Sequence, residues 1–408
     1  MSRWWSFAAL AALLGCHSPD ALDAWPARLV IASPTAQTGL TGFGVNLPPA
    51  VRLVDADGHP IAGAKITFTR TQGGGTLTGA VATTDADGVA TLGAWSITAG
   101  ANGLTASIPA PFRVDPVSFT ATGVAPAYNI DLVFLTAVSP ARQAVFDNAA
   151  AHWERLIFGD VPDIDLSGNP IPPNLCFQGQ PGISGLIDDL LIHVVLDSID
   201  GPGNILGQAA PCFIRTAGKL PLHGVMFFDT ADVALLEAQG TFDEVVLHEM
   251  GHVLGFGTLW GLQPLNLLQA SGSADPYFSG AQAIAAFNRI GGTSYTGGNK
   301  VPLENSGGPG TIESHWRETV FGNELMTGFV SIGAVNPLSV VTVASMGDEA
   351  YLVNYASADA YTHAFTTRPA PGAPAAPAAA TIWLGDDILR VPIHTVDQFG
   401  RVNGVYRP

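Results

Sequence analysis

Charge is scarce in this sequence, and positive charge most of all. Only 12% of the 408 residues are Asp, Glu, Lys or Arg, and 34 acidic residues against 17 basic ones give a formal net charge of −17. Clustered Lys and Arg bind phosphate backbones and anionic lipid surfaces, and this sequence has no such cluster. These absences argue against binding to nucleic acid and against electrostatic docking on a membrane.

Long hydrophobic runs are also missing, apart from one near the start. Arg3 is followed by an apolar stretch, residues 4–14, that is too short to span a bilayer and is typical of an export signal. Its end, Leu-Leu-Gly-Cys at 13–16, resembles a bacterial lipobox. We therefore expect a lipoprotein signal peptide over residues 1–15, with Cys16 lipidated as the only membrane contact. An ordinary cleaved secretory signal is the alternative, and either one predicts an exported protein, in the bacterial cell envelope or outside the cell.

Cysteine is nearly absent. With Cys16 removed or lipidated, only Cys176 and Cys212 remain, and in an oxidising compartment they most simply form a disulfide. This pairing leaves no thiol to act as a catalytic nucleophile or to block a metal site.

Turn-forming residues are plentiful, with 47 Gly and 30 Pro. Residues 26–126 contain short alternating runs separated by Gly, Asp and Pro, which predicts an all-β module. Asp-Ala-Asp-Gly occurs at 55–58 and again at 85–88. Calcium binding is conceivable there, but the other ligands of a calcium loop are missing and hairpin turns are favoured. Residues 51–70, 73–75 and 84–95 resemble the bacterial immunoglobulin-like domains of invasin and intimin, which implies a spacer or adhesive module.

The pattern changes near residue 127. Ser139-Pro140 predicts the start of a helix, and strand-like runs follow at 190–196, 205–214 and 223–228. We expect an α+β domain over residues 127–365, with a mostly irregular insertion after residue 260 that contains a short helix at 281–289. A Pro/Ala linker at 366–380 and a small C-terminal hairpin or tail at 381–408 complete the predicted organisation.

The most informative motif is His248-Glu249-Met250-Gly251-His252. Two histidines four residues apart lie on one face of a helix and can hold one metal ion, with the glutamate beside it. At this chain's His and Glu content, roughly 0.005 occurrences are expected by chance. Thr241 and Glu244 predict a capping box at the start of this helix, and a core helix with satisfied histidines is the alternative interpretation.

A catalytic zinc ion needs a third protein ligand and an open position. The helix is followed by Gly255, which suits a sharp turn, but Thr258 stands where a compact HExxHxxGxxH site would have its last histidine. Farther along, His315 lies in Glu-Ser-His-Trp-Arg-Glu, and Met326 lies in the short Glu-Leu-Met-Thr-Gly segment after it. His363 and His394 are expected to be surface residues, and His193 and His223 to be structural.

These segments together resemble the leishmanolysin-type metallopeptidases, which belong to the metzincins. The resemblance covers about residues 128–362 and implies a site with one zinc ion. His248, His252 and His315 would bind the zinc, Glu249 would be the general base, and Met326 would form the apolar floor of the Met turn. Family members are often held latent by a pro-segment cysteine, and this chain has no free cysteine for that role.

The predicted protein is thus multidomain, with an immunoglobulin-like sandwich before an α+β metzincin-type zinc peptidase domain. The expected activity is hydrolysis of peptide bonds in a protein or peptide substrate, with Glu249 taking a proton from water. The substrate is expected to add a strand to the sheet edge formed by residues 205–214. The competing hypothesis is a surface adhesin or binding lipoprotein whose zinc site is structural or inactive. A third alternative is a metal-dependent hydrolase that acts on a non-peptide substrate, which the motif allows but the resemblance disfavours. The sequence does not predict an oligomeric state.

Overall fold

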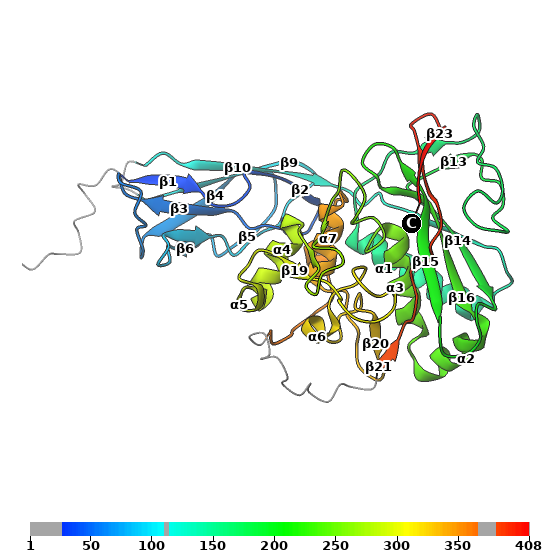
Figure 1. Cartoon of the computed structure of the whole chain (residues 1–408). Coiled ribbons are helices and arrows are strands. Elements are labelled where there is room, and N and C mark those ends of the chain that lie inside the picture. Colours follow the sequence, from blue (N-terminus) through cyan, green and yellow to red (C-terminus); the bar gives the residue numbers. More distant parts are fainter. Residues whose placement is uncertain (1–26, 110–113, 366–380, 408) are drawn as a thin grey trace, which may run out of the picture. The chain divides into compact units, whose positions relative to one another are not determined.

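The computed structural model describes residues 27–109, 114–365 and 381–407 (Figure 1). The predicted signal peptide with Cys16 and the predicted linker at 366–380 lie outside the described residues. The chain divides into two compact units, Met1–Gln37 with Leu47–Gly123, and Thr38–Asn46 with Val124–Pro408. Within the described ranges, no helix is both long enough and apolar enough to cross a membrane.

The first unit is all β, as predicted. One sheet has the strand order β1-β3-β7 and the other β2-β10-β9-β4-β6, and β5 pairs with β8. Phe68, Trp95, Leu104 and Phe119 are buried in its core. The strands are β1 (Arg28–Ile31), β2 (Ala36–Leu40), β3 (Ala50–Val54), β4 (Lys65–Gln72), β5 (Leu77–Thr78), β6 (Val81–Thr83), β7 (Val89–Thr91), β8 (Ala94–Trp95), β9 (Gly100–Ser107) and β10 (Val117–Val124).

The two Asp-Ala-Asp-Gly segments form the same kind of turn. Asp55 Oδ1 accepts hydrogen bonds from the backbone amides of Asp57 and His59, each at 2.9 Å. Asp85 Oδ1 accepts from the amides of Asp87 and Val89 in the same way. An Asp that bonds its own backbone two residues on is a turn former. These contacts confirm turns at both places, but the turns do not close hairpins, because β3 and β4, and likewise β6 and β7, belong to different sheets.

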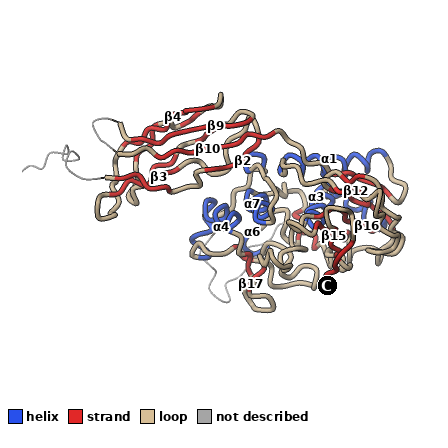
Figure 2. Tube along the Cα trace, turned by 90° about the horizontal axis from the view of Figure 1, so that it is seen from above, coloured by secondary structure: helices blue, strands red, loops and turns tan. Residues whose placement is uncertain are grey.

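A six-stranded sheet forms the frame of the second unit, in the order β11-β14-β16-β15-β22-β23 (Figures 1 and 2). The strand β15 runs antiparallel to β16 and parallel to β22. The strands are β11 (Ile130–Phe134), β14 (Leu190–Asp197), β15 (Gly207–Arg215), β16 (Pro221–Asp229), β22 (Ile393–Val396) and β23 (Val402–Tyr406), and the short strands β12 (Ile164–Asp165) and β13 (Leu186–Ile187) pair with each other.

Three helices pack against strands of this sheet: α1 (Pro140–Leu156), α2 (Thr230–Gln239) and α3 (Phe242–Leu254). The predicted start of α1 is confirmed, because Ser139 Oγ accepts from the amide of Arg142. Trp153 of α1 is fully buried and donates its indole N–H to the carbonyl of Leu247 in α3, at 3.0 Å. Helix α3 begins at the predicted place, but the capping box is absent. Thr241 makes no capping bond, and Glu244 binds Asn336 instead.

The insertion after α3 is built around aromatic side chains rather than regular secondary structure. Phe256, Trp260, Phe278, Trp316 and Phe321 are fully buried, with several ring centroids 4.5–5.6 Å apart. Its elements are short: β17 (Leu268–Gln269), β18 (Tyr277–Phe278), α4 (Ala281–Phe287), a π-helix (Asn288–Gly292), α5 (Thr293–Thr296), β19 (Val301–Pro302), α6 (Glu318–Phe321) and β20 (Phe329–Ser331), followed by α7 (Val340–Asp348) and a 3-10 turn (Tyr355–Ser357).

The C-terminal segment, which was predicted to be a small hairpin or tail, is part of the sheets of the second unit. Strands β22 and β23 do form an antiparallel pair, but β22 also pairs with β15 through Phe213–Arg215, and β21 (Thr381–Trp383) pairs with β20. The expectation that residues 205–214 offer a sheet edge to a substrate is therefore wrong. The strand β22 pairs with Phe213–Arg215, and residues 387–389 pair with Ala209. A disulfide joins Cys176 to Cys212 in the middle of β15.

Candidate metal centre

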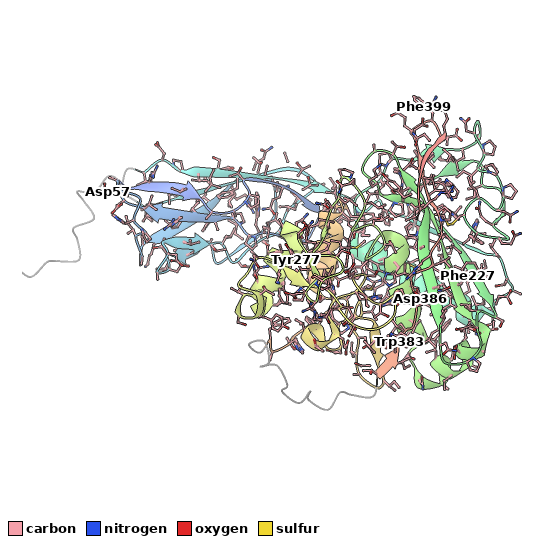
Figure 3. The ribbon with its side chains drawn as sticks, viewed as in Figure 1. Asp57, Phe227, Tyr277, Trp383, Asp386 and Phe399 are labelled. Carbon is pink, nitrogen blue, oxygen red and sulfur yellow. A yellow bond between two sulfur atoms is a disulfide. The ribbon has the colours of Figure 1, made fainter. Side chains whose placement is uncertain are left out.

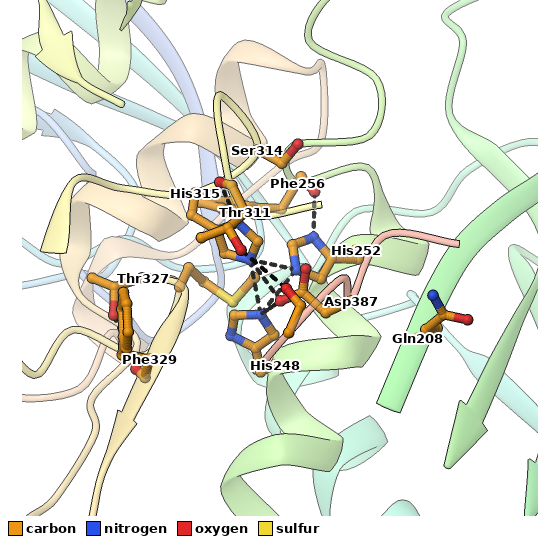
Figure 4. A network of polar contacts seen from close by, with 12 residues as sticks. Gln208, His248, His252, Phe256, Thr311, Ser314, His315, Thr327, Phe329 and Asp387 are labelled. Atoms are coloured by element: carbon orange, nitrogen blue, oxygen red, sulfur yellow. Dashed lines mark hydrogen bonds and ion pairs between the residues drawn. The ribbon is translucent and has the colours of Figure 1, made fainter. Parts of the chain in front are cut away.

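Three histidines from two distant segments converge at one point (Figure 4). His248 and His252 come from consecutive turns of α3, and His315 from the loop before α6. Their Nε2 atoms lie 2.9 Å apart for His248 and His252, 3.0 Å for His252 and His315, and 3.2 Å for His248 and His315. All three side chains are fully buried. The structure thus brings together the three histidines that the sequence analysis predicted as ligands.

The backbone fixes the orientation of each ring. The Nδ1 atom of His248 lies 2.8 Å from the carbonyl oxygen of Leu325, that of His252 2.8 Å from Phe256 O, and that of His315 3.0 Å from Thr311 O. A carbonyl only accepts, so Nδ1 carries the proton and each Nε2 presents a lone pair to the centre. Burial, reinforced by the neighbouring histidines, lowers the pKa of His252 well below its usual value.

A zinc ion fits this donor set. Three lone pairs that face one another cannot satisfy each other by hydrogen bonding, and a cation between them removes the conflict. Nitrogen ligands about 2.0–2.1 Å from a tetrahedral zinc ion are about 3.3 Å apart, close to the separations seen here. The carbonyls behind the rings are the usual outer partners of metal-binding histidines.

Asp387 is a fourth member of this cluster. Its Oδ2 atom lies 3.1 Å from His315 Nε2 and 3.4 Å from His248 Nε2, and its side chain is fully buried. The sequence analysis missed Asp387, having placed it in a terminal hairpin or tail. No local spacing could have revealed it, because only the pairing of β20 with β21 and of β15 with β22 brings this segment to the histidines.

Glu249 lies beside the cluster in a buried position. Neither of its carboxylate oxygens has a hydrogen-bond partner among the described residues. Burial, and then the charge of Asp387, raise the pKa of Glu249 well above its usual value. Gly207 at the start of β15 makes room for it, since a Cβ atom there would be 3.2 Å from Glu249 Cγ. The carboxylate is thus free of other partners in the site.

Met326 packs against α3 at Gly251, which lies between His248 and His252 in the chain. A Cβ atom at Gly251 would lie 2.8 Å from Met326 Cε and 3.0 Å from Trp153 Cζ2, so these two side chains occupy the space above that glycine. Met326 is fully buried, and its amide donates to Glu324 Oε2 at 2.7 Å. This location is compatible with the role of an apolar floor that the resemblance implies.

Two glycines carry the chain out of α3. Gly255 has φ +125°, and Gly257 has φ +75° and lies against the backbone of Ser314, next to the third histidine. Between them, Phe256 supplies the carbonyl that holds His252. A turn with two such φ values disfavours residues other than glycine. The turn therefore links the end of the helix directly to the loop of His315.

The buried side chain of Glu349 lies against this turn, and a Cβ atom at Gly255 would clash with its carboxyl group. Burial raises the pKa of Glu349 to about 8, against an ordinary 4.5, although Trp260 donates to its Oε1 at 2.7 Å. A folded-state pKa above the unfolded value means that the folded protein binds more protons between the two, so stability falls as the pH rises through that window.

We expect Glu349→Gln to remove this pH dependence. Between about pH 5 and pH 8 the wild type should lose on the order of 3 kcal/mol relative to the variant, which mimics the protonated acid. Urea unfolding at a series of pH values measures the difference. Equal pH slopes for the two proteins would show that Glu349 titrates normally in the folded chain.

Two family models match this chain. Residues 166–367 match the family model described as leishmanolysin, and they include the three histidines, Glu249 and Met326. This chain carries a leishmanolysin domain. Residues 49–122 match the model of a bacterial Ig-like domain (group 1), so the N-terminal unit is an immunoglobulin-like domain. The leishmanolysin match does not extend to Asp387.

One curated relative is the ciliated left-right organizer metallopeptidase of Xenopus laevis, 26% identical over 236 residues. The alignment covers 50% of this chain and 32% of the relative, so this chain spans about a third of that protein's length. Among solved structures, the D0-D1 domain of intimin is 20% identical, with a TM-score of 0.17 over 23% of this chain and 43% of that one. The crystal structure of invasin is 22% identical, with a TM-score of 0.18 over 26% and 23%.

Proposed function

We propose that the leishmanolysin domain is a zinc-dependent endopeptidase of an exported protein. The observation that carries this proposal is the convergence of three buried Nε2 atoms beside Glu249, a buried glutamate without a hydrogen-bond partner among the described residues. His248, His252 and His315 would hold the ion. A zinc site that only stabilises the fold has no need of a free carboxylate next to its ligands, which favours catalysis.

Zinc would supply a Lewis acid to this site when bound. The residues of the chain provide the proton chemistry. Glu249 is placed to accept a proton from a water molecule that attacks a peptide carbonyl, and then to pass it to the departing amine. The backbone carbonyls of Leu325, Phe256 and Thr311 keep the three rings fixed throughout.

The second candidate function is a surface adhesin or binding protein with a structural or inactive zinc site. The presence of Asp387 favours it, because four protein ligands make a closed site of the structural type. The immunoglobulin-like domain also suits a surface protein. Protein cleavage by the purified Asp387→Ala variant, whose site would keep only the three histidines, separates the two candidates.

We expect His315→Ala to lose most of the bound zinc and all cleavage of casein. Removing one of the three nitrogen ligands leaves the two histidines of α3 and the carboxylate of Asp387, a donor set that should bind zinc far more weakly. Metal content by mass spectrometry and casein hydrolysis over several hours measure both effects. His363→Ala, which replaces an exposed histidine, is the matched control and should behave like the wild type. A His315→Ala protein that keeps its zinc and its activity would remove the third ligand from the proposal.

A further inference from the structure

The segment 381–396, which we term the strap, crosses the metal centre in an extended path. On one side of the site, β21 pairs with β20 and the amide of Leu384 donates to Gly328 O at 3.2 Å. The hydroxyl of Thr311 donates to Gly385 O at 3.0 Å, while the Thr311 carbonyl holds the ring of His315. Figure 3 shows Trp383 on β21 and Asp386 a little farther along the same segment. The strap is therefore bound to the loop of the third histidine.

On the other side of the site the strap covers the edge of β15. Gln208 Nε2 donates to Asp386 O at 2.6 Å, and the amide of Ala209 donates to Asp387 O at 2.9 Å. The amide of Leu389 in turn donates to Ala209 O at 3.1 Å. The strand β22 then continues the pairing along Phe213–Arg215. A peptide can add to a sheet only at an unpaired edge, and the strap occupies the edge nearest to Glu249.

Between these two anchors, Asp387 turns its carboxylate toward the histidines. Neither oxygen has a hydrogen-bond partner among the described residues, and the side chain is fully buried. An unpaired buried carboxylate is costly, and a cation shared with the three Nε2 atoms would compensate for it. The backbone carbonyl of Asp387 accepts a hydrogen bond from the amide of Ala209. The group of the strap that faces the histidines is therefore the side-chain carboxylate of Asp387 and not a peptide bond.

We propose that the strap is an internal inhibitor of the peptidase, with Asp387 as the fourth ligand of the metal ion. Four protein ligands leave no position for the water molecule that peptide hydrolysis requires, and the strap backbone takes the place of a substrate strand. The full chain is then latent, and it becomes active when the strap leaves the site. This inference rests on the proposed function, because only an active peptidase can be inhibited.

The test compares full-length wild type, Asp387→Ala and the matched control Asp386→Asn, which alters the neighbouring, partly exposed carboxylate. Competition with a chromophoric chelator gives the affinity for Zn²⁺, and casein hydrolysis gives the activity of each zinc-loaded protein. We expect Asp387→Ala to bind zinc at least 10-fold more weakly and to cleave casein at least 10-fold faster than the wild type. Asp386→Asn should match the wild type in both measurements.

The possible failures can be told apart. If wild type and Asp387→Ala cleave casein equally fast, the inhibitor role is overturned and the proposed function stands. If zinc affinity is unchanged in Asp387→Ala, Asp387 is not a ligand. If all the zinc-loaded proteins fail to cleave casein, both the proposed function and its regulation are overturned.

A second variant keeps the test valid if Asp387→Ala does not fold. Leu389→Pro removes the amide that binds Ala209 and leaves Asp387 unchanged. It loosens the pairing of the strap with β15, so we expect faster casein cleavage than in the wild type. Unchanged cleavage by a folded Leu389→Pro protein would contradict strand competition at β15.

Discussion

Replacing Glu249 with Gln is expected to reduce peptide cleavage by about 10³-fold while the zinc stays bound. Gln has nearly the same shape but cannot accept a proton from water. Neither oxygen of Glu249 has another partner to lose among the described residues, and therefore the fold should be unaffected. Steady-state cleavage of casein or a fluorogenic peptide measures the loss, both in the wild-type background and with Asp387→Ala.

The matched control for this experiment is Asp243→Asn, an exposed acidic residue of the same helix. It should keep both activity and zinc. Metal content must be measured for every variant, because a drop in zinc would mimic a catalytic defect. Undiminished cleavage by a zinc-loaded Glu249→Gln protein would end the assignment of Glu249 as the general base.

Gly257→Ala is expected to destabilise the leishmanolysin domain by about 4 kcal/mol, combining backbone strain with overpacking. Gly257 has φ +75°, and a Cβ atom there would lie against the carbonyl of Ser314, with the carbonyl carbon only 2.9 Å away. Backbone atoms cannot move aside as a flexible side chain can. Relief of the clash would displace the adjacent His315, so zinc affinity should fall together with stability.

Chemical unfolding and chelator competition measure these two effects of Gly257→Ala. The matched control is Gly261→Ala, because that glycine is exposed and a Cβ atom there would meet nothing within 4 Å. The control should differ little from the wild type in either measurement. A Gly257→Ala protein with the stability of the control would show that the turn can adapt without moving the loop of His315.

The sequence predicted those parts of the site that local patterns encode. The spacing of His248 and His252 depends only on the period of a helix, and the start of α1 depends only on a cap and a proline. His315 is far from the motif in the chain, and only the resemblance to a family implied it. Predictions that depend on contacts between distant parts of the chain were less successful. Glu244 meets Asn336 from another part of the chain, so the predicted capping box does not form.

Asp387 could not be predicted because its role depends on strand pairing. Its neighbourhood in the sequence contains another acidic residue and a glycine but no metal-binding pattern. The buried position arises only when β21 joins β20 and β22 joins β15. For the same reason β15 looked like an edge, since the strand that covers it belongs to a segment remote in the sequence.

The pairing of β15 with β22 also bears on the order in which the domain folds. Phe213 and His394 are register partners, yet most of the domain lies between them in the chain. Closing so long a loop has a high entropic cost until the intervening chain is compact, so this pairing should form late and be among the first to open. A folding molecule would then pass through a stage in which the histidines are assembled and the edge of β15 is still bare. If the site cleaves peptides as proposed, unfolded neighbours that reach it during that interval would be cut, so the rate of the last strand addition would determine how much protein is lost during folding.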